Sequence, residues 1–113
     1  MSNAARIRRP KAATFAALGD ETRLRLLSKL TQGQPRSITD LTHCTTLTRQ
    51  AVRKHLRVLE QARVVRVQRV GRESLFSLNP APIVEMQAYL QQVSGRWNDA
   101  LTRLKTFVEA GPA

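Results

Sequence analysis

The sequence predicts a mainly α-helical domain that carries one small β-hairpin. Apolar residues recur at steps of three and four along most of the chain, as in helices that bury one face. Residues 64–78 instead alternate between apolar and polar types and are interrupted by a glycine, as in a hairpin. The chain has 113 residues, enough to bury a core without disulfide or metal support. We therefore expect one domain with the element order α-α-α-α-β-β-α.

The first two helices are predicted from their ends. The first is expected over residues 11–18, with Phe15 and Leu18 as apolar anchors and Gly19 as its stop. Asp20 is expected to cap the second helix, because its carboxylate can accept hydrogen bonds from the unpaired N–H groups at a helix start. The buried face of the second helix is expected to consist of Leu24, Leu26, Leu27 and Leu30.

The next two helices are predicted to form a helix-turn-helix. Ser37 to Asp40 resembles a capping box and starts a short helix that ends near Cys44. After a turn, Thr48 is expected to cap a fourth, strongly amphipathic helix. Its inner face would hold Ala51, Val52, His55, Leu56 and Leu59, and its outer face Arg49, Gln50, Arg53, Lys54 and Arg57. A second helix with a basic outer face is typical of a DNA-reading helix.

The hairpin completes a winged helix-turn-helix. Strands are expected over residues 64–70 and 74–78, and Gly71 suits the tight connection between them. The residues expected to contact DNA are Thr48, Arg49, Gln50, Arg53, Lys54 and Arg57 in the helix, and Arg66, Arg69, Gly71 and Arg72 in the wing. By their bidentate geometry, Gln50 suits adenine and Arg53 suits guanine. The wing arginines suit either a narrow minor groove or phosphates.

A long final helix is expected over residues 80–110. Its apolar positions continue at steps of three and four for some 25 residues, more than one small protomer can cover. A partner helix would cover the remainder and make a dimer. We therefore divide the chain into a flexible basic arm, residues 1–11, and a winged helix-turn-helix domain, residues 12–110, whose dimerisation helix begins at about residue 80.

The charge balance favours a polyanionic partner. The chain has 19 Lys and Arg against eight Asp and Glu, a net charge of +11, which favours double-stranded DNA. A membrane-surface helix is disfavoured because no bulky aromatic stripe lies beside the basic residues. One Trp, one Tyr and three Phe are few for stacking single-stranded bases. With no apolar run of membrane-spanning length and a single cysteine, we expect a cytoplasmic protein without membrane association.

Three segments together resemble the ArsR/SmtB family of bacterial winged-helix repressors. They are Phe15–Leu27 (FAALGDETRLRLL), Thr48–Glu60 (TRQAVRKHLRVLE) and the stretch from Arg96-Trp97 to Lys105. The resemblance covers roughly residues 12–108. It implies a homodimeric repressor, built on its first and last helices, that binds an operator with dyad symmetry. The interface residues expected on this basis are Phe15, Leu90, Val93, Trp97, Leu101 and Leu104.

The chain departs from the family at two places. The metal-binding Cys-x-Cys of many members is replaced here by residues 41–44, and the last helix contains no His or Cys. We therefore expect no metal and no cofactor. Arg63 occupies the position where members usually place a helix-ending glycine. An arginine in a left-handed cap would cost about 1 kcal/mol, so either the helix ends differently or a phosphate contact offsets the strain.

The remaining reactive side chains have simple interpretations. His55 is expected to be a hydrogen-bonded core histidine, and Cys44, like most free cysteines, a small buried residue. His43 and Cys44 supply only half of a zinc site. There is no Gly-rich phosphate loop and no nucleophile with a base, so we expect no enzyme activity. The alternative functions are a non-specific nucleic-acid packaging protein and an interaction module. The effector, if there is one, is not encoded in any motif.

Overall fold

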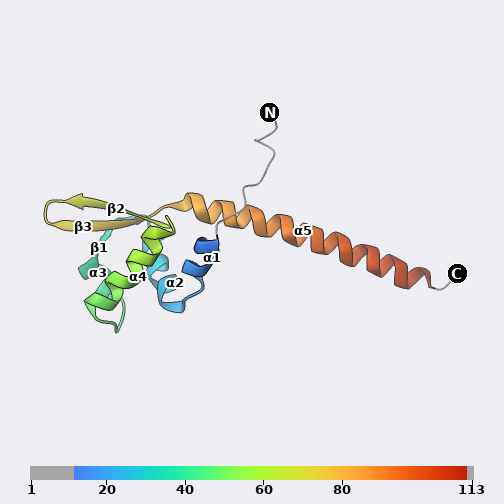
Figure 1. The fold of residues 1–113 in the computed structure, drawn as a ribbon, viewed down its shortest axis with the longest axis horizontal. Helices are drawn as coiled ribbons and strands as arrows, with labels where there is room; N and C mark the ends of the chain where they lie inside the picture. The colour runs from blue at the N-terminus through green and yellow to red at the C-terminus, as the bar shows by residue number, and fades with distance from the viewer. Residues whose placement is uncertain (1–11, 112–113) are drawn as a thin grey trace, which may run out of the picture. The chain divides into compact units, whose positions relative to one another are not determined.

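The computed structural model describes residues 12–111, which fall into two units, residues 12–83 and residues 84–111. The basic arm at residues 1–11 lies outside the described residues. Figure 1 shows the elements in chain order: α1 (Ala12–Leu18), α2 (Glu21–Leu30), β1 (Arg36–Ser37), α3 (Ile38–His43), α4 (Arg49–Gln61), β2 (Val65–Val70), β3 (Glu73–Leu78) and α5 (Pro80–Ala110). The predicted helices and hairpin are confirmed, and one short strand, β1, is added.

Three helices begin where the sequence predicts. The side chains of Asp20, Ser37 and Thr48 accept hydrogen bonds from backbone N–H groups three residues further on, at 3.0, 3.1 and 3.1 Å. Each cap satisfies an N–H that the helix itself cannot pair. The caps therefore fix where α2, α3 and α4 start, and with them the residues that form the turn of the helix-turn-helix.

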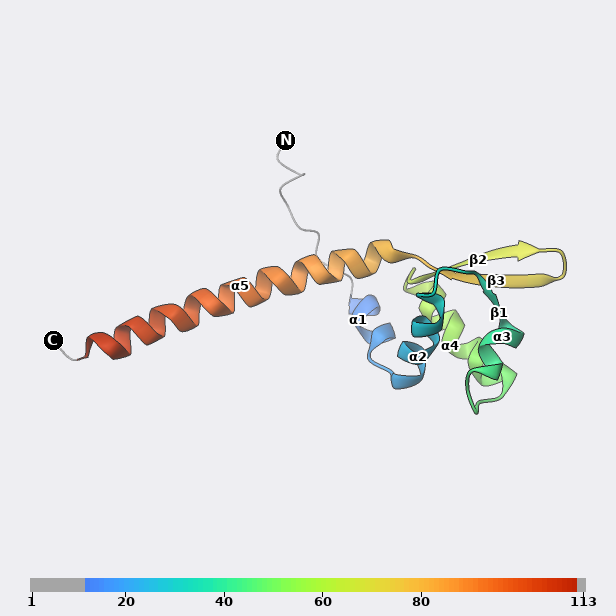
Figure 2. The same ribbon diagram turned by 180° about the vertical axis from the view of Figure 1, so that it is seen from behind.

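The sheet is antiparallel, with the strand order β1-β3-β2 (Figure 2). β2 and β3 form the predicted hairpin, which closes through Gly71 at φ 62°. Positive φ at the first loop position is what a type II′ turn requires, and glycine adopts it without strain. β1 has only two residues, paired with Phe76 and Leu75. Such a strand exists through tertiary pairing alone and leaves no periodic signal in the sequence.

The core lies between the helices and one face of the sheet. α4 buries Val52, Leu56 and Leu59 completely or nearly so, as predicted. The prediction for α2 was wrong at Leu24, which is 49% exposed. The other buried apolar residues of residues 12–83 are Ala17, Leu26, Leu27, Leu30, Leu41, Ala62, Val64, Val65 and Phe76.

α4 ends with Arg63 in the left-handed conformation, at φ 61°. The Val64 N–H donates to the Leu59 carbonyl at 3.0 Å, and the Arg63 N–H donates to the Glu60 carbonyl at 2.9 Å. These two bonds define a Schellman motif, which usually has glycine at this position. Asn79 Nδ2 also donates to the Arg63 carbonyl at 2.8 Å. The helix thus ends in the usual way, and the arginine carries the strain.

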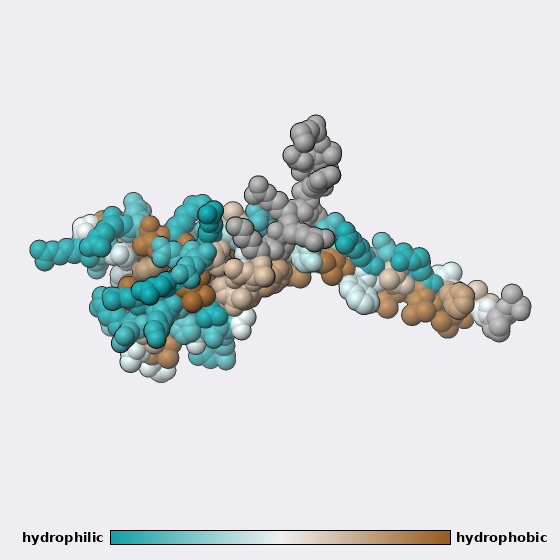
Figure 3. Space-filling model, viewed as in Figure 1, coloured by the Kyte–Doolittle hydropathy of each residue, from teal (hydrophilic) through white to brown (hydrophobic). Residues whose placement is uncertain are grey.

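The second unit is the part of α5 that follows Ile83. No residue of α5 is buried, and its stripe of large apolar side chains is exposed: Trp97 is 65% exposed, Leu101 55% and Leu104 59%. Figure 3 shows hydrophobic side chains gathered along one side of the helix, with hydrophilic ones along the other. No helix within residues 12–111 is long and apolar enough to cross a membrane.

Candidate nucleic-acid interface

The outer face of α4 is exposed, as its amphipathic pattern predicts. Thr48, Arg49, Gln50, Arg53, Lys54 and Arg57 are all exposed. The opposite face is anchored in the core and α3 packs beside the helix (Figures 1 and 2). The cationic surface is therefore presented on a helix that cannot rotate without unpacking the core.

Alternate side chains of the wing, the hairpin formed by β2 and β3, point to opposite faces of the sheet, so its arginines do not all lie on the same face. Val67 and Phe76 are cross-strand partners, so they and Arg69, two residues further along β2, share the sheet face turned toward α4. Arg66 is three residues from Arg69 and therefore lies on the other face. Its Nη2 donates to Asn79 Oδ1 at 3.0 Å. Of the predicted wing contacts, Arg66 is thus bonded to the protein at the root of the wing, away from α4.

Four arginines line one hollow of about 200 Å³ between α4 and the wing. Arg49 and Arg53 come from the start of α4, and Arg69 and Arg72 from the tip of the hairpin. We call this hollow the arginine slot. Glu73 is the acid among the described residues that line it. The slot therefore lies between α4 and the wing, the two elements that the sequence analysis separately predicts to contact DNA.

The slot holds positive charge that the protein leaves largely unpaired. Arg49 Nη1 donates to Thr39 Oγ1 at 3.2 Å, so α3 helps to orient this guanidinium. Within residues 12–111, the guanidinium groups of Arg53, Arg69 and Arg72 make no hydrogen bond or ion pair. Guanidinium groups around one hollow repel each other, and a bound polyanion relieves that repulsion.

A second hollow of about 210 Å³ continues along the same side of α4. Its walls include the apolar side chains of Leu56, Val67 and Phe76, and Arg53 and Arg57 stand at its edge. Arg53 therefore lines both hollows. Gln50 and Lys54 line neither of them.

On the inner face of α4, His55 has a hydrogen-bond partner, as expected, but it is only partly buried and belongs to a polar cluster at the edge of the core. Its ring is partly buried, and Nδ1 lies 3.3 Å from Arg23 Nη1 and 3.9 Å from Asp20 Oδ2. Arg23 Nε also donates to the Ala17 carbonyl at 2.7 Å. The cluster joins the end of α1, the start of α2 and the middle of α4, and it explains why a histidine is accommodated on this face.

The same cluster affects the ionisation of Asp20. The backbone N–H of Arg23 donates to the Asp20 carboxylate and lowers the pKa of that carboxyl below its ordinary value. The electrostatic effects of Arg23 and His55 on this carboxyl act in the same direction. Ionised Asp20 therefore stabilises the start of α2.

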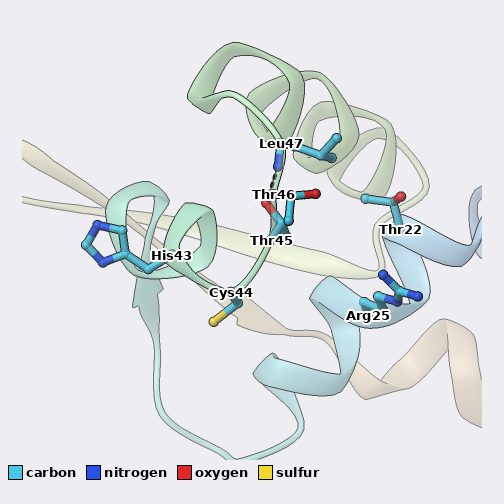
Figure 4. A pocket seen from close by; sticks show the side chains of 7 residues that line it. All are labelled: Thr22, Arg25, His43, Cys44, Thr45, Thr46 and Leu47. Atoms are coloured by element: carbon cyan, nitrogen blue, oxygen red, sulfur yellow. Dashed lines mark hydrogen bonds between the residues drawn. The ribbon is translucent and has the colours of Figure 1, made fainter.

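Cys44 was expected to be buried, and that prediction was wrong. Its side chain is exposed, and Sγ donates to the Asp40 carbonyl at 3.3 Å. It lines an open hollow of about 320 Å³ with His43, the turn before α4 and two residues of α2, Thr22 and Arg25 (Figure 4). Within residues 12–111, no three His, Cys, Asp or Glu side chains gather closely enough to hold a metal ion.

Comparisons with known proteins agree with the helix-turn-helix fold. A family model described as a helix-turn-helix domain matches residues 18–68. The chain is 37% identical over 79 residues to YuzN, an uncharacterized HTH-type transcriptional regulator of Bacillus subtilis, in a match that covers 65% of this chain and 86% of that protein. It is 40% identical over 67 residues to a transcriptional repressor SmtB homolog of Synechocystis, covering 59% of this chain and 50% of that protein.

A solved structure extends the similarity to most of the chain. An ArsR-like transcriptional regulator from Rhodococcus has a TM-score of 0.82 and 31% sequence identity, with 89% of this chain and 92% of that chain covered. The similarity therefore includes the wing as well as the helix-turn-helix.

Proposed function

Because the chain belongs to the ArsR family of winged helix-turn-helix transcriptional regulators, we propose that it is a homodimeric repressor that binds a DNA operator of dyad symmetry. The family consists of DNA-binding regulators and not of enzymes. The observation that carries the proposal is the exposed cationic face of α4 beside the arginine slot. α4 enters the major groove, and the wing lies against the flanking DNA.

The DNA-contacting residues are those of the recognition face and the wing. They are Thr48, Arg49, Gln50, Arg53, Lys54 and Arg57 in α4 and its cap, and Arg69, Gly71 and Arg72 near the wing tip. Arg66 belongs to the set only through its charge, because its guanidinium is bonded to Asn79. Thr48 acts first as the helix cap, since its hydroxyl already accepts from the Ala51 N–H.

The apolar stripe of α5 supports the homodimer. Trp97, Leu101 and Leu104 are each more than half exposed in the single chain, and a contiguous apolar stripe of this size on a helix favours burial against a second copy. Leu90 and Val93 continue the same stripe toward the start of the helix. Phe15 of α1 completes the proposed interface.

The Synechocystis relative, whose name describes a transcriptional repressor, supports the proposed repressor role. A dimer bound at a promoter excludes RNA polymerase from the DNA that it covers. Two-fold symmetry would place the two copies of α4 in successive major grooves, about 34 Å apart. The operator is therefore expected to be a palindrome with half-sites about one helical turn apart.

Selection of binding sites from random DNA by the full chain tests this function. The expected product is a palindrome that the protein continues to bind in the presence of excess bulk DNA. The net charge of +11 makes a packaging protein the alternative. Recovery of no preferred sequence, with binding abolished by bulk DNA, would support that alternative and refute the repressor.

Two substitutions on opposite sides of α5 test the dimer. Leu104→Glu places a charge in the apolar stripe, whereas Thr106→Glu, two residues on, places the same charge about 200° around the helix. Sedimentation equilibrium should give a monomer for Leu104→Glu and a dimer for both Thr106→Glu and the unaltered protein. A monomeric unaltered protein at micromolar concentration would rule the dimer out.

A further inference from the structure

We propose that the arginine slot holds the sugar-phosphate backbone of one DNA strand, so that Arg53 binds phosphate while Gln50 and Lys54 read the bases. This inference rests on the proposed function and assigns separate roles within its recognition surface. It replaces the expectation, based on residue type alone, that Arg53 recognises guanine. The ligand class is a phosphodiester, held between two walls of guanidinium groups.

The direction in which each side chain leaves α4 supports this division. Gln50 lies two positions before the buried Val52, and Lys54 lies two positions before the buried Leu56. Two positions correspond to about 200° around a helix, so Gln50 and Lys54 lie on the side away from the core. They line neither hollow and point outward, where a major groove would lie. Arg53 lines both hollows and therefore stands on the flank that faces the wing.

The chemistry of the slot suits phosphate better than a base edge. Guanidinium groups bind phosphate oxygens through paired N–H donors, and Arg53 and Arg69 approach the slot from opposite walls. A base edge inside a duplex is reached from one groove and not from two sides, whereas a backbone strand that lies between a helix and a wing is accessible from both. Thr39 already orients Arg49 toward this position, through the 3.2 Å hydrogen bond to its guanidinium.

The unpaired positive charge of the slot also supports phosphate as its ligand. Within residues 12–111, the guanidinium groups of Arg53, Arg69 and Arg72 have no hydrogen-bond or ion-pair partner, whereas that of Arg66, at the root of the wing, donates to the Asn79 side chain. Repulsion between the slot arginines is relieved when each is placed near a phosphate. The slot therefore supplies affinity and salt dependence, and the outer ridge of α4 supplies sequence preference.

Adjacent substitutions in α4 test the assignment. Arg53→Ala and Lys54→Ala each remove one positive charge from an exposed position, so both should weaken operator binding. Only Arg53→Ala should lower the salt slope, by roughly 0.9 per protomer, because only Arg53 neutralises a phosphate. Binding is measured on the selected operator and on operators with single base-pair changes, each of which weakens the unaltered protein roughly tenfold or more. Arg53→Ala should keep the ratio of the affinity for the selected operator to the affinity for each changed operator. Lys54→Ala and Gln50→Ala should each bring this ratio close to one at a single base-pair position of the half-site.

The opposite pattern would overturn the proposal. If Arg53→Ala relaxes preference at one base pair while Lys54→Ala leaves every ratio unchanged, Arg53 reads a base. Thermal melting of each variant checks that the fold is intact. If the unaltered protein selects no sequence, the proposed function fails, yet Arg53→Ala and Arg69→Ala should still lower the salt slope on bulk DNA. Unchanged slopes there would refute the slot itself.

A free anion is the other source of phosphate, and a competition experiment separates the two. Inorganic phosphate is added to the protein–DNA complex at constant ionic strength and compared with chloride. The proposal predicts equal dissociation in the two salts, because a free phosphate gains none of the contacts that the protein makes to the rest of the duplex. Dissociation by phosphate well beyond that caused by chloride would assign the slot to a free anionic ligand and overturn the backbone assignment.

Discussion

Replacing Arg63 with glycine is expected to stabilise the folded protein by roughly 0.5–1 kcal/mol. A left-handed backbone costs a non-glycine residue about 1–2 kcal/mol, and Arg63 has φ 61°. Glycine removes that strain but gives the unfolded chain more freedom, which returns about 0.4–1 kcal/mol. For a domain of this size the net gain corresponds to a rise of roughly 2–6 °C in Tm.

The matched control is Arg63→Ala, which also removes the guanidinium but keeps the Cβ that makes the left-handed conformation costly. Urea denaturation is followed at one fixed protein concentration, because dimerisation would make stability depend on concentration. Arg63→Gly should be more stable than Arg63→Ala by about 1 kcal/mol. Equal stability of the two variants would show that the backbone at this residue is not left-handed, and the account of the end of α4 would be wrong.

DNA binding by the same two variants tests why the strain is tolerated. The Schellman hydrogen bonds and the Asn79 bond to the Arg63 carbonyl already account for this helix end. Arg63→Gly should therefore bind the operator nearly as well as the unaltered protein. A large and equal loss of affinity in both variants would indicate that the arginine is kept for a phosphate contact.

Three further substitutions probe the caps and the slot. Thr48→Ala removes the acceptor for the Ala51 N–H and should destabilise the protein by about 1 kcal/mol in urea denaturation; no change would mean that α4 starts elsewhere. The folded state lowers the pKa of the Asp20 carboxyl. Ionised Asp20 therefore stabilises the protein fully above the ordinary pKa of about 3.9, and this stabilisation is lost as the pH falls through the folded pKa. The stability of Asp20→Asn should therefore approach that of the unaltered protein in acid, and a gap that stays constant from neutral pH to pH 2 would contradict this role. Glu73→Gln removes the acid from the slot and should strengthen DNA binding by up to about fivefold, the equivalent of roughly 0.2–1 kcal/mol; weaker binding would show that Glu73 orients an arginine.

The elements that the sequence predicted correctly depend on local interactions. The caps at Asp20, Ser37 and Thr48 act over three residues, and the faces of α4 follow from its 3.6-residue period. For Arg63, the family resemblance left open whether the helix ends differently, and the left-handed backbone with its Schellman bonds shows that it ends in the usual way. Each of these features is decided by neighbours within about one turn of helix, and such neighbours are visible in the sequence.

The errors have a common cause in contacts between distant segments. Leu24 has the same residue type as its buried neighbours, yet no element within residues 12–111 buries it. His55 pairs with Arg23, 32 residues away, and β1 exists only because β3 offers it an edge. Thr39 and Asn79 were not singled out, since a threonine and an asparagine carry no signal until their partners, Arg49 and Arg66, are placed beside them.

By itself, the sequence determined that this chain is a winged helix-turn-helix whose fourth helix has a cationic outer face, because periodicity, capping and charge are properties of short segments. Only the tertiary structure decided which arginines act together. The register of the hairpin places Arg69 on the face turned toward α4 and Arg66 on the other, although the two are three residues apart. Side-chain direction in a strand depends on pairing and on the element packed against it, so the arginine slot exists only once α4 and the wing are brought together.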